Sequence, residues 1–242
     1  MRFHRANLVT TALACALLLG GCASNGSRID PLEPLNRGIY RFNDVADKAV
    51  LKPVARAYKA VTPVPVRTAV GNFFSNLDDV LVTANDVLQF KFRRAAGDAS
   101  RVIFNSTFGV AGLFDVASVW GLEKHDEDFG QTLGYWGIGT GAYLVLPLLG
   151  PSTLRDTLGL VVDNEGDLVT NIGDVPTRNS GIGLRFTDHR TSLLDTEKIL
   201  EEAAIDPYLF LRDAYLQRRR SLVYDGNPPP QEFDDDTGEP LP

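Results

Sequence analysis

Two histidines are the first side chains to test for chemistry, because many hydrolases place an imidazole beside a nucleophile. His125 stands in an acidic run that continues with Asp126, and His189 lies between Asp188 and Arg190. The chain lacks the Gly-x-Ser-x-Gly elbow that holds the serine nucleophile of many lipases. We interpret both histidines as solvated loop residues and predict no catalytic residues. A lipid hydrolase that uses them is an alternative.

Two further motifs have the spacing of ligand sites. GIGTGA at 137–142 matches a dinucleotide-binding turn, but that turn needs a strand before it and a helix after it, and Pro147 interrupts the segment after the motif. DNEGD at 163–167 resembles the start of a calcium loop, with its glycine at the fourth position instead of the sixth. We therefore predict a turn at 163–167, and neither a cofactor nor a metal site.

Cys22 is a candidate for acylation. A positively charged start is followed by a 12-residue apolar run at 8–19 and by two glycines. That run is shorter than the roughly 20 residues that span a bilayer, and it is typical of a signal peptide. LGGC at 19–22 resembles the bacterial lipobox, whose cysteine receives a diacylglyceryl group. We predict a signal peptide at 1–21 and a lipid anchor at Cys22 with a linker to 29; a plain secretory signal is the alternative.

The charge is moderately acidic and indicates no polyanionic partner. The 242 residues carry a formal charge of −7 and are 44% hydrophobic, as in ordinary globular proteins. Residues 225–242 hold six acids, five prolines and no basic residue. Such a segment has too little apolar surface to offset chain ordering, so we predict a disordered acidic tail and no nucleic-acid binding.

The remaining residues, 30–224, have the size of one domain and helical periodicity. Apolar residues at 35, 39, 42 and 46 share one helix face. Prolines and acidic residues then predict separate short helices near 54–61, 66–74, 80–92 and 95–104. Asp206 and Pro207 open a C-terminal helix, with arginines 218–220 on its outside. The predicted fold class is all-α.

Glycine is concentrated between residues 109 and 183, which hold 14 of the 22 glycines and both tryptophans. Glycine is unfavourable inside helices, so this region is predicted as loops and short helices. Its dense apolar and aromatic residues indicate a surface that meets lipid or encloses an apolar passage. An irregular buried core is the alternative.

Three motifs occur in one order along residues 30–220. They are DPLEPLNR at 30–37 with YRFN at 40–43, DFGQTLG at 128–134 with YLVLP at 143–147 and GPS at 150–152, and DPY at 206–208 with RDAY at 212–215. This set resembles the MlaA (VacJ) family of phospholipid-transport lipoproteins. One departure is Ala142, where family members usually have proline.

The resemblance implies an outer-membrane lipoprotein of the Mla system. Its members remove phospholipids misplaced in the outer leaflet through an amphipathic channel and so preserve lipid asymmetry. The implied fold is an all-α, single-domain ring (donut) in the inner leaflet, on the periplasmic face, with a short glycine-hinged hairpin. The implied partners are phospholipids, a trimeric porin and a soluble periplasmic carrier, MlaC, and no covalent step is implied. A structural envelope lipoprotein without lipid transfer is the alternative.

The resemblance also gives residue-level hypotheses. Phe42 and Asn43 are expected close to the channel, and residues 143–149 are expected to form the apolar strands of a mobile hairpin. The expected gating loop comprises Gly137, Gly139, Gly141, Tyr143, Pro147 and Gly150.

The lipobox predicts that the mature chain begins at Cys22 and carries acyl chains. Two or three chains would anchor the protein stably, because each buried methylene contributes about 0.8 kcal/mol. Mass spectrometry of the mature N-terminus tests this prediction. An unmodified Cys22 would contradict it.

Overall fold

The computed structural model describes residues 30–203 and 205–230. The predicted signal peptide, Cys22 and most of the acidic tail lie outside the described residues. Asp225, where the tail was predicted to begin, contacts the body: its Oδ1 accepts from Lys91 Nζ at 2.6 Å and from Arg94 Nη1 at 2.5 Å.

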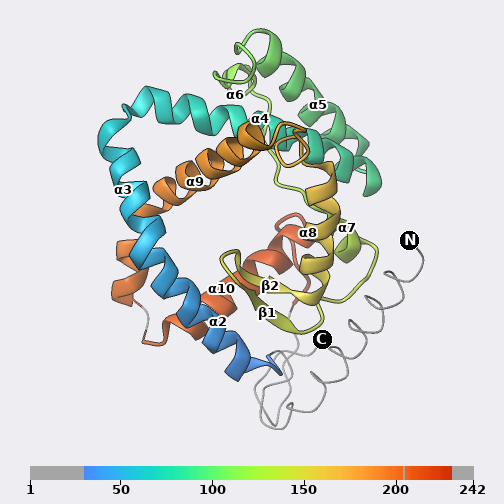
Figure 1. The fold of residues 1–242 in the computed structure, drawn as a ribbon. Helices are drawn as coiled ribbons and strands as arrows, with labels where there is room; N and C mark the ends of the chain where they lie inside the picture. Colours follow the sequence, from blue (N-terminus) through green and yellow to red (C-terminus); the bar gives the residue numbers. More distant parts are fainter. Residues whose placement is uncertain (1–29, 204, 231–242) are drawn as a thin grey trace, which may run out of the picture.

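Helices dominate the described chain and follow one another around a central opening in the ribbon (Figure 1). In chain order the elements are α2 (Glu33–Ala46), η1 (Asp47–Leu51, a π-helix), α3 (Lys52–Val61), α4 (Val64–Leu88), α5 (Phe92–Thr107), α6 (Val116–Val119), α7 (Phe129–Tyr135), β1 (Tyr143–Leu146), β2 (Gly150–Thr153), α8 (Leu154–Gly166), α9 (Val175–Ala203) and α10 (Pro207–Val223). The mostly helical, single-domain fold predicted from the sequence is confirmed.

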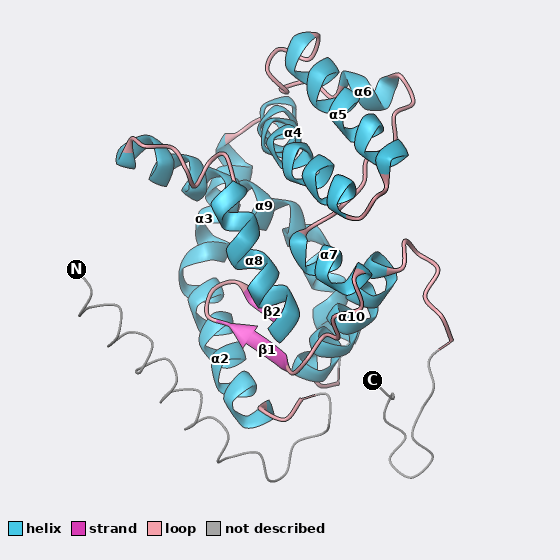
Figure 2. Cartoon of the chain, turned by 90° about the vertical axis from the view of Figure 1, so that its right-hand side faces the viewer, coloured by secondary structure: helices cyan, strands magenta, loops and turns pink. Residues whose placement is uncertain are grey.

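Helices pack in pairs around the ring, and one of these pairs joins segments far apart in sequence. α9 packs along α3, α5 along α4, and α7 along α8. The single β-hairpin of the described chain lies between α2 and α10 (Figure 2). Proline in the first turn begins α2, α3, α4 and α10, where its missing N–H removes no helical hydrogen bond. Asp206 caps α10 by accepting from the Tyr208 and Leu209 amides at 2.9 and 3.2 Å.

Two predicted helices, 66–74 and 80–92, are one helix, so that prediction was wrong. α4 runs unbroken from Val64 to Leu88. Asp78 and Asp79 do not begin a new helix, because both carboxylates face other elements: Asp78 pairs with Arg185, and Asp79 pairs with Arg101.

The turn predicted at 163–167 was also wrong, since Asp163 lies in the last turns of α8. Its carboxylate accepts from the Phe129 amide at 2.9 Å and thereby joins α8 to the start of α7. Of the glycine-rich region predicted as loops and short helices, the short α6 and α7 agree. The 13-residue α8 and the start of α9 do not.

Arg219 was placed on the outside of its helix and is instead buried. Its guanidinium pairs with Asp128 and Asp156, which are 91 and 63 residues away in sequence. These ion pairs hold α10 against α7 and α8, and they hold the pKa of both carboxyl groups below the usual range despite burial.

Many polar side chains of the described residues are buried, while many large apolar side chains are exposed. Arg101 is 1% exposed and Asp79 0%, whereas Val119 is 82% and Val61 79% exposed. The Arg101 guanidinium donates hydrogen bonds to Asp79, Asp115, Ser118 and the Leu122 carbonyl, so each of its three nitrogens has a partner. A buried charge of this kind is tolerated because it is paired and hydrogen-bonded.

None of the described helices combines the length and the apolar character needed to cross a membrane.

Replacing Arg101 by methionine should destabilise the fold, because it leaves Asp79 buried with one cation fewer. Breaking a buried pair on one side costs about 3 kcal/mol or more. The free energy of unfolding, measured by urea titration of the full chain in detergent micelles, should fall by that amount. The control is Arg93→Met on the same helix at an exposed position, expected within about 0.5 kcal/mol of the parent. Equal losses in the two variants would contradict the assignment.

Candidate functional site

The only strands in the described residues form a short hairpin inside the ring. β1 pairs antiparallel with β2, with Tyr143 opposite Thr153 and Leu146 opposite Gly150. The sequence placed both strands within 143–149; the second strand instead begins at Gly150, because residues 147–149 form the connection. Leu148 and Leu149 at that tip are 53% and 62% exposed. The hairpin therefore presents an apolar tip.

The base of the hairpin is fixed by a buried polar cluster. The Asn36 Nδ2 donates to the Tyr143 carbonyl at 3.0 Å and to Asp30 Oδ1 at 2.8 Å, while its Oδ1 accepts from the Val145 amide at 2.9 Å. The Tyr208 hydroxyl donates to Asp30. Tyr143 is fully buried, and burial raises the pKa of its phenol. This cluster ties the start of α2, the hairpin and α10 together.

Among the described residues, the side-chain hydrogen bonds to the backbone of the tip come from one residue. Asn43, on α2, donates from Nδ2 to the Leu146 carbonyl at 2.9 Å and accepts at Oδ1 from the Leu148 amide at 2.7 Å. Its amide thus completes the backbone hydrogen bonding of the turn. The neighbouring Phe42 is 56% exposed.

The glycines around the hairpin fall into two kinds. Gly137, Gly141 and Gly150 have φ of +86°, +67° and +87°, a conformation that other residues adopt at a cost. A Cβ on Gly141 would also meet the Leu154 Cβ at 3.0 Å. Gly139 has no positive φ, and a Cβ on it would meet no other atom within 4 Å, so alanine fits there in this conformation.

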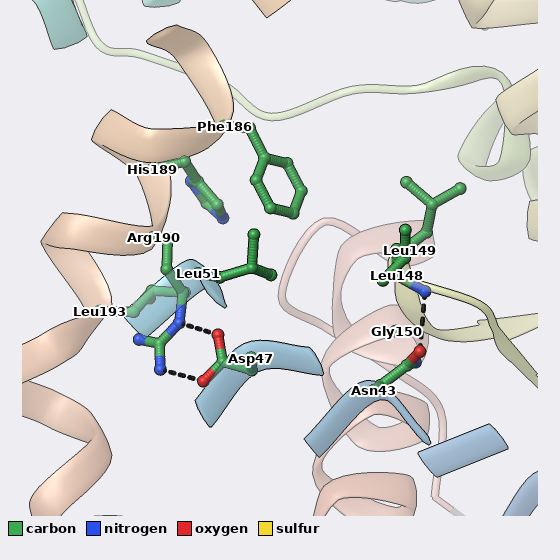
Figure 3. A pocket seen from close by; sticks show the side chains of 10 residues that line it. All are labelled: Asn43, Asp47, Leu51, Leu148, Leu149, Gly150, Phe186, His189, Arg190 and Leu193. Carbon is green, nitrogen blue, oxygen red and sulfur yellow. Dashed lines mark hydrogen bonds and ion pairs between the residues drawn. The ribbon is translucent and has the colours of Figure 1, made fainter. Parts of the chain in front are cut away.

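A cavity of about 230 Å³ is lined by the hairpin tip, α2, η1 and α9 (Figure 3). Its walls are mostly apolar, and in Figure 3 Phe186 and Leu51 project toward the space facing the hairpin. The lining residues are Asn43, Asp47, Leu51, Leu148, Leu149, Gly150, Phe186, His189, Arg190 and Leu193. The wall on the α9 side is therefore built by residues far from any of the sequence motifs.

One ion pair fixes the α9 wall. Arg190 Nε and Nη2 each lie 2.7 Å from a carboxylate oxygen of Asp47, and Nη2 also lies 2.8 Å from Glu197. The hydrogen bond to Asp47 raises the pKa of Arg190, so the guanidinium stays charged at any physiological pH. Neutralised by two carboxylates, it braces the wall between η1 and α9.

The prediction of solvated loop histidines is half right for each: His125 lies in a loop but is partly buried, and His189 is exposed but lies on a helix. His125 Nδ1 lies 2.9 Å from the buried carboxylate of Asp98. His189 lies on α9 and lines the cavity. Among the described residues, neither ring hydrogen-bonds a serine, threonine or cysteine side chain. No group of three or more metal-ligating side chains gathers in the described part of the chain.

The structure brings part of the predicted site together. Asn43 and Gly150 line the cavity, while Tyr143 lies at the buried base of the hairpin and Gly137 and Gly139 face open space. Sequence reasoning missed Asp47 and Arg190, because a bridge between residues 143 positions apart leaves no local signal.

Comparison with known proteins agrees with this geometry. The model of a family described as MlaA lipoprotein matches residues 28–222. The chain belongs to the MlaA lipoprotein family.

Relatives match over most of their length. The chain is 35% identical over 236 residues to the intermembrane phospholipid transport system lipoprotein MlaA of Escherichia coli (strain K12), covering 93% of this chain and 92% of that one. It is 32% identical to the protein of the same name from Haemophilus influenzae, covering 90% and 91%. A solved structure from work on the structural basis for maintenance of bacterial outer membrane lipid asymmetry superposes with a TM-score of 0.71 at 33% identity, covering 82% of this chain and 99% of that chain.

Replacing Asn43 by alanine should loosen the hairpin tip without unfolding the ring. It removes two hydrogen bonds worth about 1 kcal/mol each, so exchange of the Leu148 amide should accelerate roughly ten-fold or more. Hydrogen exchange of the peptide that contains residues 146–150, followed by mass spectrometry, measures this. Asn72→Ala, which removes a bond to the Leu113 carbonyl elsewhere, should leave that peptide unchanged. Unaltered exchange in Asn43→Ala would contradict the role of Asn43.

Proposed function

We propose that this protein is the outer-membrane component of an intermembrane phospholipid transport system, and that it removes mislocalised phospholipids from the outer leaflet. The observation that carries the proposal is the apolar cavity between a glycine-flanked hairpin and the ring wall. Membership of the MlaA lipoprotein family, whose relatives are named for phospholipid transport, supports it.

A lipid that leaves the outer leaflet must move a charged headgroup through apolar surroundings, where an unsatisfied charge is expensive. A passage with both polar and apolar walls lowers that barrier without a covalent step. The cavity has this mixed character: Leu51, Phe186 and Leu193 suit acyl chains, while His189 offers a hydrogen bond to a headgroup.

The hairpin is proposed as the gate. Its base is fixed by Asn36 and Asp30, whereas the side-chain hydrogen bonds to the backbone of the apolar tip come, among the described residues, from Asn43 alone. Gly137, Gly141 and Gly150 occupy positive φ at or near the ends of the segment that carries the tip. A segment pinned at its base and weakly held at its tip can pivot, and glycines allow the backbone rotation that a pivot needs.

Anchoring and partners complete the proposal. Cys22 would hold the ring to the periplasmic face of the outer membrane through its acyl chains. Ala23 at the next position, rather than aspartate, favours that membrane by resemblance to sorted lipoproteins. A trimeric porin would hold the ring in place, and the soluble carrier MlaC would receive the lipid; the family resemblance supports both.

Transport rather than catalysis fits the described side chains, since neither histidine is paired with a nucleophile. A purely structural envelope lipoprotein is the competing function. The two differ in cargo: a transporter purified from cells should carry phospholipid, and a scaffold should carry none.

The gate is tested by Gly139→Ala, because alanine fits Gly139 in the conformation of the structure. If the hairpin pivots, alanine restricts the backbone in the second conformation, and outer-leaflet phospholipid should rise toward the level of a deletion strain. Outer-leaflet phospholipid is measured in deletion strains that express each variant at equal abundance.

The matched control is Gly173→Ala, another position with open space for a Cβ, in the connection between α8 and α9. This variant should keep clearance at the parental level. Normal clearance of outer-leaflet phospholipid in Gly139→Ala would overturn the proposed gate. The transport function is tested separately, by the phospholipid that co-purifies with the protein.

A further inference from the structure

A second cavity, of about 380 Å³, lies away from the hairpin. It is formed where α4, α8 and α10 meet the segment that leads into α7, and it shares no residue with the cavity under the hairpin. Its volume is within the range of small-molecule sites in proteins. The transport mechanism proposed for the hairpin does not use it.

The lining of this cavity is rich in carboxylates. Five acidic side chains face two arginines. The acids are Asp78, Asp126, Glu127, Asp128 and Asp163, and the arginines are Arg218 and Arg219. Arg219 is already bound to Asp128 and Asp156. Arg218 is 72% exposed and comes no closer than 3.9 Å to Asp126, so its donors are available to a ligand.

A buried acceptor in the same lining lacks a donor. Gln131 is 2% exposed; its Nε2 donates to the Asp126 carbonyl and to Asp128, but its Oε1 has no hydrogen-bond partner among the described residues. An unsatisfied buried acceptor is costly, which points to a donor that the described chain itself does not supply.

Two of the carboxylates are also incompletely compensated. Burial raises the pKa of Asp163, and burial likewise raises the pKa of Asp78. A cation placed in the cavity would favour the charged form of both groups. The described residues offer no set of side chains grouped to ligate a metal ion, so a larger cation with N–H donors fits better.

We propose that this cavity binds a primary ammonium group joined to a phosphate, the chemistry of a phosphoethanolamine headgroup. The ammonium donates to Gln131 Oε1 and to the carboxylates of Asp126 and Asp163, and Arg218 binds the phosphate. A trimethylammonium group carries no N–H and would leave Gln131 Oε1 unsatisfied. The headgroup can belong to a membrane lipid, in which case the site rests on the proposed transport function, or to a free water-soluble ester.

Calorimetric titration of the full chain, purified in a non-ionic detergent, tests the site with glycerophosphoethanolamine as the probe. Glycerophosphocholine should bind at least about ten-fold more weakly, because it lacks the charge-assisted hydrogen bonds. Asp126→Asn and Arg218→Gln should each weaken glycerophosphoethanolamine binding about ten-fold. Free ethanolamine should lose affinity in Asp126→Asn but not in Arg218→Gln.

The matched control is Glu123→Gln, which removes an equal charge from an 88% exposed side chain three residues before Asp126 and outside the lining. This variant should bind glycerophosphoethanolamine with the affinity of the parent protein. Equal affinity for the ethanolamine and choline esters, no heat with either, or an equal loss in Glu123→Gln and Asp126→Asn would each overturn the proposal.

The source of the headgroup is distinguished with vesicles. Parental protein that prefers phosphatidylethanolamine over phosphatidylcholine vesicles, with the preference lost in Asp126→Asn, identifies a lipid headgroup. Binding of the soluble ester without a vesicle preference identifies the free ester, and both results support the site. Loss of ester binding in Asp126→Asn with normal outer-leaflet clearance would separate this site from the transport function. Co-purified phospholipid tests that function independently.

Discussion

The fold depends on buried polar side chains that join one helix to another or to the hairpin. Arg101 joins α5 to α4 and to the start of α6, Arg219 joins α10 to α7 and α8, and Asn36 joins α2 to the hairpin, each through several hydrogen bonds. Apolar side chains such as Val61 and Val119 stay exposed instead. A hydrophobic core alone would not define this shape, because removing one partner of such a network leaves a buried charge or amide uncompensated. An exposed apolar exterior also suits a protein held at a lipid surface.

The same polar network sets what can move. Asn36 and Asp30 hold the hairpin base in a buried cluster with Tyr208, while the tip depends on Asn43 at a partly exposed position. The Arg190 ion pair with Asp47 joins α9 to η1 on the opposite wall of the cavity. A fixed wall facing a weakly held tip is the arrangement expected of a gate, since low-stability segments are those that open without global unfolding.

Local patterns in the sequence predicted helices where one apolar face and a proline at the first turn agree, as in α2 and α10. The order of motifs predicted the family. Prediction failed where a polar side chain pairs with a residue on another element. Asp79 was predicted to begin a helix but pairs with Arg101. Arg219 was predicted to lie on the surface but is buried beside Asp128. The cavity wall from Asp47 and Arg190 was missed for the same reason. Such pairings are set by how the helices pack together, which a local window of sequence does not show.

The proposed transport requires that phospholipid occupies the cavity under the hairpin. Site-specific photo-crosslinking from position 186, where Phe186 projects into that cavity, tests this most directly in living cells (Figure 3). We predict a covalent phospholipid adduct at this position that diminishes when Asn43 is replaced or the hairpin gate is restricted. Absence of any lipid adduct from position 186, in a variant that still clears the outer leaflet, would contradict the mechanism.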